Sequence, residues 1–324
     1  MKKLLYISPN PKSAVSWYRG LGVLNQLRGT EVTDGSNSEQ SWNSISQYDI
    51  IFLERPCRET DVYIMNYAKM LGKKVWVDFD DLAWEVPKYH PQAFSYRSEA
   101  FKNNIKMCIM GADVVTTTNQ YLADKIKPMN KNVVIIPNAL NDYVFKDFKK
   151  YNKNSKDILY RGGPQHMADL DEFSEEITNV IDDKPKYNFH FWGFSPYMIG
   201  DFVKNDSNVH WMPQIDIMYY FQKIQDLNPK VVMVPLIKSD FNKAISNIAW
   251  IEATLAGAVA LVPSYSSSFV VDGALTYGDD SFEVLLIESV KEDLHKYHEL
   301  SVQTVKDKFL LSVVNEKRYE IVEP

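Results

Sequence analysis

Residues 241–262 combine a polar loop, a carboxylate and a glycine in an order suited to binding a phosphorylated ligand. The spacing of apolar residues predicts an amphipathic helix that places Glu252 on one face and ends at Gly257, before an apolar run typical of a buried parallel strand. A helix start presents free N–H groups to a diphosphate, and a carboxylate about two turns on can accept hydrogen bonds from ribose. The segment predicts a nucleotide-sugar site, with a plain scaffold role as the alternative. Its predicted donor-binding residues are Asn242, Ser246, Asn247 and Glu252.

A second group of polar residues follows a predicted strand at Ile158–Tyr160. Gly162 and Gly163 allow the backbone to approach a phosphate closely, although such a pair also makes an ordinary turn. His166 and Asp169 are three residues apart, so they share a face at a helix start. Two interpretations remain open for this pair, a helix cap and a contact with substrate.

An aromatic turn, residues 192–196, follows another predicted strand. Aromatic planes and backbone amides are suited to holding a uracil-type base, and an ordinary strand-to-loop transition is the alternative. The predicted donor-binding residues here are Trp192, Gly193 and Phe194.

Carboxylates gather in the turn of residues 78–81, at the end of a central strand of the first half. Asp78 or Asp80 is a candidate general base toward an acceptor hydroxyl, which implies inversion of configuration. Alternatively, the group binds Mg²⁺ or Mn²⁺. The third interpretation is structural, with the carboxylates capping the next turn and pairing with Arg19 or Arg55. The predicted acceptor-binding residues are Tyr18, Arg19, Arg55 and Asp81.

The elements that must position these side chains alternate between strand and helix, which predicts an α/β chain with two doubly wound domains. The strands expected in the first half are Leu4–Ser8, Asp49–Leu53, Lys74–Asp78, Asp113–Thr117 and Val133–Ile136. A single helix is expected over Trp17–Leu27. The strands expected in the second half are Ile158–Tyr160, Asn188–Phe191, Val209–Trp211, Val231–Pro235 and Ala258–Val262. The predicted domains span residues 1–150 and 151–300, and a helix in 301–324 crosses back to the first. Apolar residues at helical spacing indicate one end helix over Glu292–Val314.

Composition narrows the functional class. The 324 residues suit two domains, and no apolar run reaches the ~18–20 residues of a membrane span. The net charge of −6 disfavours sequence-independent binding of nucleic acid. Two distant cysteines and an N-terminal segment without a cleavage site indicate a cytoplasmic protein.

Taken in order, several segments resemble the GT-B glycosyltransferases, in particular the retaining, family 4-like group. The resemblance extends over nearly the whole chain and rests on residues 17–19, 77–82, 111–118, 135–139, 162–170 and the region of Glu252. In detail the chain looks most like enzymes encoded by bacteria and their phages, some of which decorate hydroxylated DNA bases. The resemblance implies two Rossmann-like domains facing a cleft, the first for the acceptor and the second for the nucleotide sugar. It also implies retention, with no obligatory metal or cofactor beyond that co-substrate.

The chain departs from this pattern where positive charge is expected. Many relatives carry lysines where this chain has Ile245 and Ala249, and the first glutamate of a Glu-x7-Glu pair is replaced by Ala244. Because a leaving diphosphate needs electrostatic stabilisation, Arg161 and Lys243 are the candidates to supply it. We count them, with Asp78 and Asp80, as candidate catalytic residues.

The resulting hypothesis is a transferase that moves a sugar, UDP-linked by expectation, to a hydroxyl of either a hydroxymethylated DNA base or a glycan. Two alternatives stay open: a catalytically silent nucleotide or nucleic-acid binding module, and a sugar-nucleotide epimerase of the same architecture. The sequence leaves open the sugar, the nucleotide, the acceptor and the oligomeric state.

Overall fold

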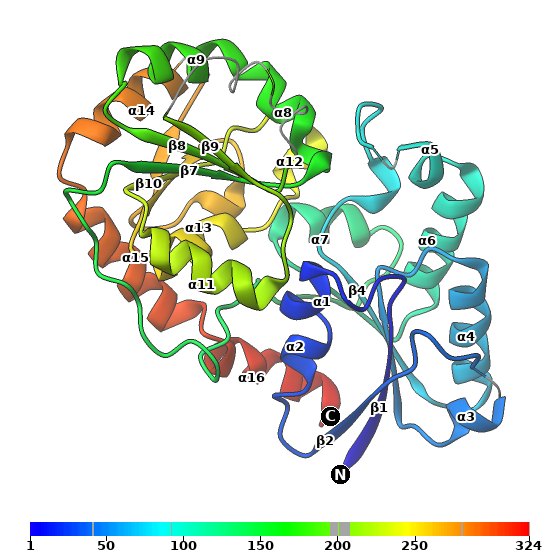
Figure 1. Cartoon of the computed structure of the whole chain (residues 1–324). Coiled ribbons are helices and arrows are strands. Elements are labelled where there is room, and N and C mark those ends of the chain that lie inside the picture. The colour runs from blue at the N-terminus through cyan, green and yellow to red at the C-terminus, as the bar shows by residue number, and fades with distance from the viewer. Residues whose placement is uncertain (41, 92, 195–199, 201–207, 280, 324) are drawn as a thin grey trace.

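The computed structural model describes residues 1–40, 42–91, 93–194, 200, 208–279 and 281–323. Within these ranges the chain forms two lobes, each built on a six-stranded parallel sheet (Figure 1). The N-terminal sheet has the order β2-β1-β3-β4-β5-β6, and the C-terminal sheet has the order β12-β11-β10-β7-β8-β9. Strand order reverses at β1/β3 in the first and at β7/β10 in the second, and ligands bind at such switch points in open α/β sheets.

The N-terminal strands are β1 (Lys2–Ile7), β2 (Thr30–Asp34), β3 (Ile50–Glu54), β4 (Lys74–Phe79), β5 (Val114–Thr117) and β6 (Val133–Ile135). The helices of this half are α1 (Ala14–Tyr18), α2 (Leu21–Leu24), α3 (Trp42–Ser46), α4 (Glu59–Met70), α5 (Ala93–Tyr96), α6 (Glu99–Gly111) and α7 (Gln120–Ile126). The C-terminal strands are β7 (Asp157–Arg161), β8 (Asn188–Trp192), β9 (Val209–Met212), β10 (Val231–Met233), β11 (Val259–Pro263) and β12 (Leu275–Tyr277). The remaining helices are α8 (Met167–Glu172), α9 (Ser174–Asp183), α11 (Ile217–Leu227), α12 (Asp240–Lys243), α13 (Ile248–Leu255), α14 (Phe282–Lys291), α15 (His295–Lys308) and α16 (Leu311–Val322).

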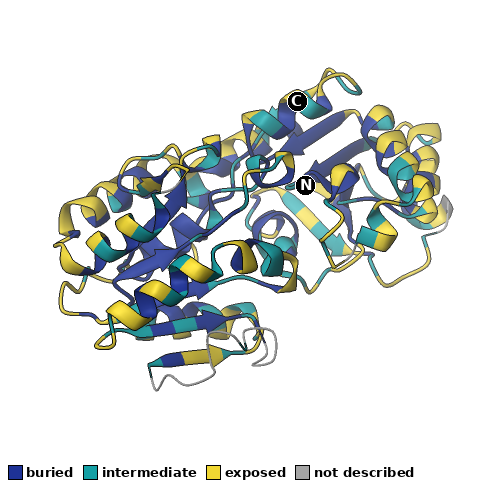
Figure 2. Ribbon diagram, turned by 90° about the horizontal axis from the view of Figure 1, so that it is seen from above, coloured by how far each residue is buried: buried dark blue, intermediate teal, exposed yellow. Residues whose placement is uncertain are grey.

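Each sheet is covered by helices on both faces, which explains why its central strands are nearly all apolar. Figure 2 shows buried central strands, partly exposed edge strands and helices whose outer faces are exposed. The prediction of two doubly wound α/β lobes is confirmed. The edge strands β2 and β12 were absent from the predicted set. Strand β2 is only partly buried and strand β12 has three residues, so neither carries a long apolar run.

The single helix expected over Trp17–Leu27 is wrong, because the chain breaks between α1 and α2. A Cβ on Gly20 would lie 2.4 Å from the Glu54 carboxylate and 2.6 Å from Tyr6, so the backbone here lies against the end of the sheet. Only glycine permits that approach.

The C-terminal segment is also two helices where one, Glu292–Val314, was indicated by spacing. Helix α15 packs on the C-terminal lobe, and α16 contributes Leu311, Val314 and Ile321 to a core of the N-terminal lobe. Between them, backbone hydrogen bonds of 2.8 Å join Leu140 to Phe309 and to Leu311. A crossing helix at residues 301–324 is consistent with this arrangement, while the exact domain boundaries stay a prediction.

Candidate functional site

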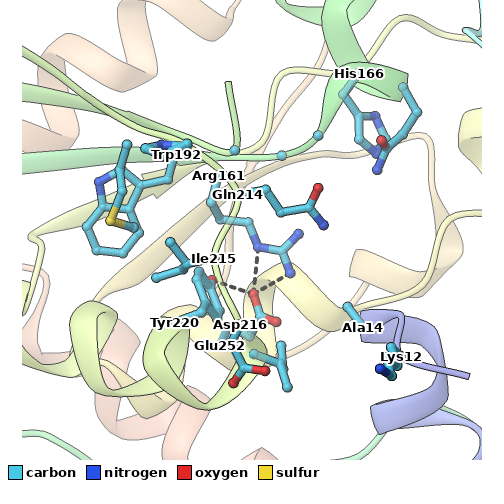
Figure 3. Close-up of a pocket in the computed structure, with 17 residues that line it drawn as sticks. Lys12, Ala14, Arg161, His166, Trp192, Gln214, Ile215, Asp216, Tyr220 and Glu252 are labelled. Carbon is cyan, nitrogen blue, oxygen red and sulfur yellow. Dashed lines mark hydrogen bonds and ion pairs between the residues drawn. The ribbon is translucent and has the colours of Figure 1, made fainter. Parts of the chain in front are cut away.

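Two cavities lie at the carboxyl ends of the strands. The first, of about 250 Å³, opens beside β7, β8 and β9 in the C-terminal lobe, and Lys12 and Ala14 of the N-terminal lobe reach it (Figure 3). The second, of about 460 Å³, lies between the lobes. Arg161, Gln165 and His166 line both, so they mark the place where the two cavities meet.

Strand β7 and the turn after it build the floor of the first cavity. Gly162 and Gly163 line it together with Trp192 and Gly193 at the end of β8. Gly193 has φ +98°, and a Cβ there would lie 1.7 Å from the carbonyl oxygen of Gly162. The two strand ends therefore touch through bare backbone, where the N–H of Gly162 donates to the carbonyl of Trp192 at 3.0 Å and the N–H of Gly193 donates to that of Met212 at 2.8 Å. The indole of Trp192 lines the same space.

Glu252 lies in this cavity wall but is only 2% exposed. Its Oε1 accepts a hydrogen bond of 2.5 Å from the Tyr18 hydroxyl, which belongs to the N-terminal lobe. Its Oε2 accepts from Arg161 Nε at 2.6 Å and from the Tyr220 hydroxyl at 2.7 Å. Figure 3 shows the guanidinium of Arg161 directed at this carboxylate. Glu252 thus joins both lobes through one buried cluster.

Burial and the charges within this cluster change the pKa values of its members. Burial, followed by the charge of Glu252, raises the pKa of Tyr18 and of Tyr220 well above the usual range. Burial would lower the pKa of Arg161, yet Glu252 and the two tyrosines raise it overall. Both tyrosine hydroxyls therefore remain donors to Glu252 throughout the physiological pH range.

The helix that carries Glu252 differs from the expected amphipathic one. In α13, every residue from Ala249 to Leu255 is buried, since the helix lies between the C-terminal sheet and α15. Its expected end is confirmed by the φ of +81° at Gly257. Asn247 is the N-cap residue and is buried, without a side-chain cap bond and outside the lining of both cavities.

The carboxylates after β4 are paired with arginines, as in the third interpretation of this turn. Asp78 is 2% exposed and holds Arg19 through bonds of 2.6 and 3.0 Å. Arg55 binds Asp80, and its Nη2 lies 2.5 Å from Asp81 Oδ2. Burial raises the pKa of Asp81 to about 6, with Arg55 opposing the shift and Asp80 adding to it.

These pairs separate the predicted acceptor-binding residues and the candidate bases Asp78 and Asp80 by their place in the structure. Arg55, Asp80 and Asp81 line the cavity between the lobes. Arg19 and Asp78 lie instead inside the N-terminal lobe, where Arg19 also donates to the backbone oxygen of Ile136. Tyr18 contacts Glu252 but lines neither cavity. The geometry thus gives Arg19 and Asp78 a structural place, because burial and mutual pairing keep both from the cleft.

Two predicted donor residues, Phe194 and Asn242, and the candidate catalytic residue Lys243 line neither cavity. Phe194 is 1% exposed and stacks on Tyr160 at 5.5 Å inside the lobe, whereas residues 195 and 196 of the same turn lie outside the described residues. Lys243 lies beside Asp240 at 3.1 Å and lines neither cavity. Asn242 is buried and donates to Asp169 at 2.7 Å. By contrast, Ser246 lines the second cavity, where its hydroxyl accepts a hydrogen bond from Asn138 at 2.8 Å.

The sequence interpretation missed several lining residues. Lys12 follows the first strand, so the rule that ligands bind at the carboxyl ends of strands could have identified it. No sequence signal marked Gln214 and Tyr220, or His90 and Tyr96 in the second cavity. Among the described residues, no group of three or more His, Cys, Asp or Glu side chains is arranged to hold a metal ion.

Comparison with known proteins rests on structure alone, since no protein-family model and no curated protein sequence matches the chain. A glycosyltransferase from Rickettsia africae superposes with a TM-score of 0.65 at 12% identity, covering 99% of this chain and 98% of that one. The chain has the GT-B fold.

Two further GT-B structures are similar. A putative UDP-N-acetylglucosamine 2-epimerase from Listeria monocytogenes has a TM-score of 0.62 at 11% identity, covering 98% of this chain and 95% of its own. A mutant of S. aureus TarM in complex with Fondaparinux, α-GlcNAc-glycerol and UDP has a TM-score of 0.59 at 15% identity. The similarity covers 85% of this chain and 55% of TarM, so the chain spans about half the length of that protein.

In the part of the chain that the structure describes, none of the helices combines the length and the apolar character of a membrane span.

Proposed function

We propose that this GT-B protein is a glycosyltransferase that binds a nucleoside-diphosphate sugar, UDP-linked, in the first cavity and passes the sugar to a hydroxyl in the second. The observation that carries the proposal is the first cavity itself, at the strand ends next to the β7/β10 switch point, with a carboxylate, two glycine turns and an indole facing it. In this arrangement Trp192 contacts the base, Glu252 lies toward the ribose, and the diphosphate lies against the glycine turn, with the N–H of Gly162 kept by its bond to Trp192.

The shared border of the cavities supports the direction of transfer. Arg161 and His166 line both spaces, so a sugar linked to a diphosphate near these residues would extend into the cavity between the lobes. The resemblance to family 4 implies retention, with the departing phosphate oxygen deprotonating the acceptor. Asp78 and Asp80, the candidate bases for inversion, are both paired with arginines, which supports the same conclusion.

For the acceptor, the charges of the second cavity favour a glycan over a hydroxymethylated DNA base. Its N-terminal side presents two carboxylates, Asp80 and Asp81, for one arginine, Arg55. Oδ1 of Asp81 is buried and, among the described residues, has no hydrogen-bond partner, so it offers an acceptor for a hydroxyl. Carboxylates repel a phosphate backbone, whereas they accept hydrogen bonds from sugar hydroxyls.

Calorimetry with UDP, GDP and ADP tests the donor site. Lys12 is exposed and lines the first cavity, so Lys12→Glu should weaken binding of the correct nucleotide about tenfold without unfolding the protein. Lys223→Glu, an equal charge change on exposed α11 outside both cavities, is the matched control. Absence of binding by all three nucleotides would refute the proposal.

Turnover then separates the activities. Incubation with UDP-sugars should release UDP only when an oligosaccharide acceptor is present, and hydroxymethylated DNA in its place tests the other acceptor. The epimerase alternative has a specific observation behind it, the ionisable Asp81 and His166 facing one cavity, and it predicts an epimerised nucleotide sugar without any acceptor. A silent binding module predicts nucleotide binding with no product.

A further inference from the structure

Two buried polar side chains, Asp169 and Asn242, support His166. The Nδ1 of His166 lies 2.8 Å from Asp169 Oδ2, and Asp169 is only 2% exposed. The other oxygen, Oδ1, accepts from Asn242 Nδ2 at 2.7 Å and from the backbone N–H of Ile237 at 2.9 Å. Asn242 is fixed in turn, since it also donates to the carbonyl of Ile237 at 2.9 Å. The orientation of Asp169 is therefore set by α12 and by the loop before it.

This arrangement determines which ring nitrogen carries a proton. A carboxylate oxygen accepts hydrogen bonds, so Nδ1 of His166 must be the N–H donor to Asp169. Nε2 is then the nitrogen left for the cavities that His166 lines. When the ring is protonated, Nε2 becomes a second donor that carries positive charge, and Asp169 stabilises that imidazolium.

The charged and titratable groups around His166 come from four elements. Asp169 is in α8, which begins directly after His166, and Arg161 ends β7. Asp81 and His90 belong to the N-terminal lobe and interact electrostatically with His166. Of the cations considered for the diphosphate, Arg161 is bound to Glu252 and Lys243 lies outside both cavities. A leaving diphosphate is stabilised by positive charge. His166 lies at the border of the two cavities, whereas Lys12 lines only the first.

We propose that His166, oriented by Asp169, is the positively charged hydrogen-bond donor to the departing diphosphate. This inference rests on the proposed function and deepens it. The acceptor oxygen bonds to the anomeric carbon as the bond from that carbon to the phosphate oxygen breaks, and the electron pair stays on the phosphate oxygen. The hydroxyl proton passes to that oxygen, while His166 keeps its own proton and stabilises the charge. Asp169 acts through His166 and is a positioning residue.

The role makes diphosphate binding depend on pH in a defined direction. Histidine is the side chain that changes its charge near neutral pH, whereas lysine keeps its charge there. Affinity for UDP should therefore fall from pH 5.5 to pH 8.5 relative to a variant whose cation persists. Uridine, which lacks the diphosphate, should show no such change.

Calorimetry of UDP and uridine at these two pH values, with variants of His166, tests the inference. His166→Lys keeps a cation at both pH values, and the ratio of wild-type to His166→Lys affinity cancels the ionisation of UDP itself. That ratio should fall about tenfold between pH 5.5 and 8.5. His166→Gln should bind UDP about tenfold more weakly than wild type at pH 5.5 only.

Asp169→Asn tests the positioning role. The donors Asn242 and Ile237 require the amide oxygen at Oδ1, so the amide NH₂ faces His166 and opposes protonation of its ring. The expected result is weaker UDP binding at pH 5.5, unchanged uridine binding and a flat pH profile. Asp171→Asn, an exposed change two residues on in the same helix, should behave as wild type.

The outcomes separate the two proposals. UDP binding that is the same in wild type, His166→Lys and His166→Gln at both pH values would overturn the role of His166 and leave the donor site standing. UDP affinity or transfer that rises with pH, with His166→Lys as weak as His166→Gln, would make the histidine a base and also overturn it. No binding of any nucleotide would overturn the proposed function and this inference together.

Discussion

The hydrogen bond from Tyr18 to Glu252 is a direct link between the lobes, and its removal gives a quantitative test of the site. Tyr18→Phe deletes one hydroxyl at 2.5 Å from the carboxylate and keeps the ring, which packs edge-on against Phe221 at 6.3 Å. A buried hydrogen bond to a charged group contributes about 1.5–3 kcal/mol. For a chain of this size, each kcal/mol changes the melting temperature by about 2 °C, so we expect a decrease of roughly 3–6 °C.

Binding should change in the opposite direction. Three hydroxyl or guanidinium donors already occupy Glu252, so ribose hydroxyls compete with Tyr18 for Oε1. Without the Tyr18 hydroxyl that oxygen is free, and the affinity for UDP should stay equal or rise by up to about tenfold.

Thermal unfolding and calorimetry of the same protein provide the assay. The stability difference should not vary between pH 5 and 9, because the pKa of Tyr18 is raised in the folded state and its ordinary value near 10 governs the unfolded state. Tyr63→Phe, which deletes an exposed hydroxyl bonded to Glu59 at 2.7 Å, is the control and should be neutral. A tenfold loss of UDP affinity in Tyr18→Phe would refute the competition argument and make the tyrosine a nucleotide contact.

Three further predictions concern other residues. Burial raises the pKa of Glu54 to about 7. Its contribution to the free energy of unfolding is therefore complete below about pH 4.5 and is lost as the pH rises through 7. Over that window, unfolding by urea should show wild type losing up to about 3 kcal/mol relative to Glu54→Gln. Gly193→Ala should prevent normal folding or lower the melting temperature by many degrees, because the added Cβ meets the carbonyl oxygen of Gly162. Gly72 has φ +66° and open space around it, so Gly72→Ala should lower the free energy of unfolding by only about 1–2 kcal/mol. Lys243→Ala should leave UDP affinity in calorimetry within about twofold of wild type, since the lysine lies outside both cavities; a tenfold loss would return it to the diphosphate site.

Local patterns were enough for the architecture. Apolar runs such as Ile50–Glu54 and Val259–Pro263 are buried on both faces, and that property follows from helices on both sides of a parallel sheet. The strand ends then fall on one edge, which is why the turns at Gly162 and at Trp192 could be assigned to a common site. The break at Gly20 was missed because its cause, contact with Glu54 and Tyr6, comes from distant parts of the chain.

For the functional side chains, too, the sequence predicted some properties and the tertiary structure decided others. Their types were recognisable in sequence, but Asp78 and Asp80 looked equivalent there, and so did Arg19 and Arg55. In the structure one pair is buried inside a lobe and the other lines a cavity, because Asp78 lies within β4 whereas Asp80 lies in the turn after the strand has ended at Phe79.

By itself, then, the sequence determined the α/β class, the two sheets and the edge at which a ligand would bind, since these depend on periodicity and on glycine. Only the tertiary structure decided which charges are free to meet a ligand. Glu252 is engaged by Tyr18 and Tyr220, 234 and 32 residues away, and Asp169, which holds His166, is fixed by Asn242 of α12, 73 residues further on. The bond from Tyr18 depends on how the two lobes pack, and the others depend on how distant elements of the C-terminal lobe pack. No local pattern encodes them.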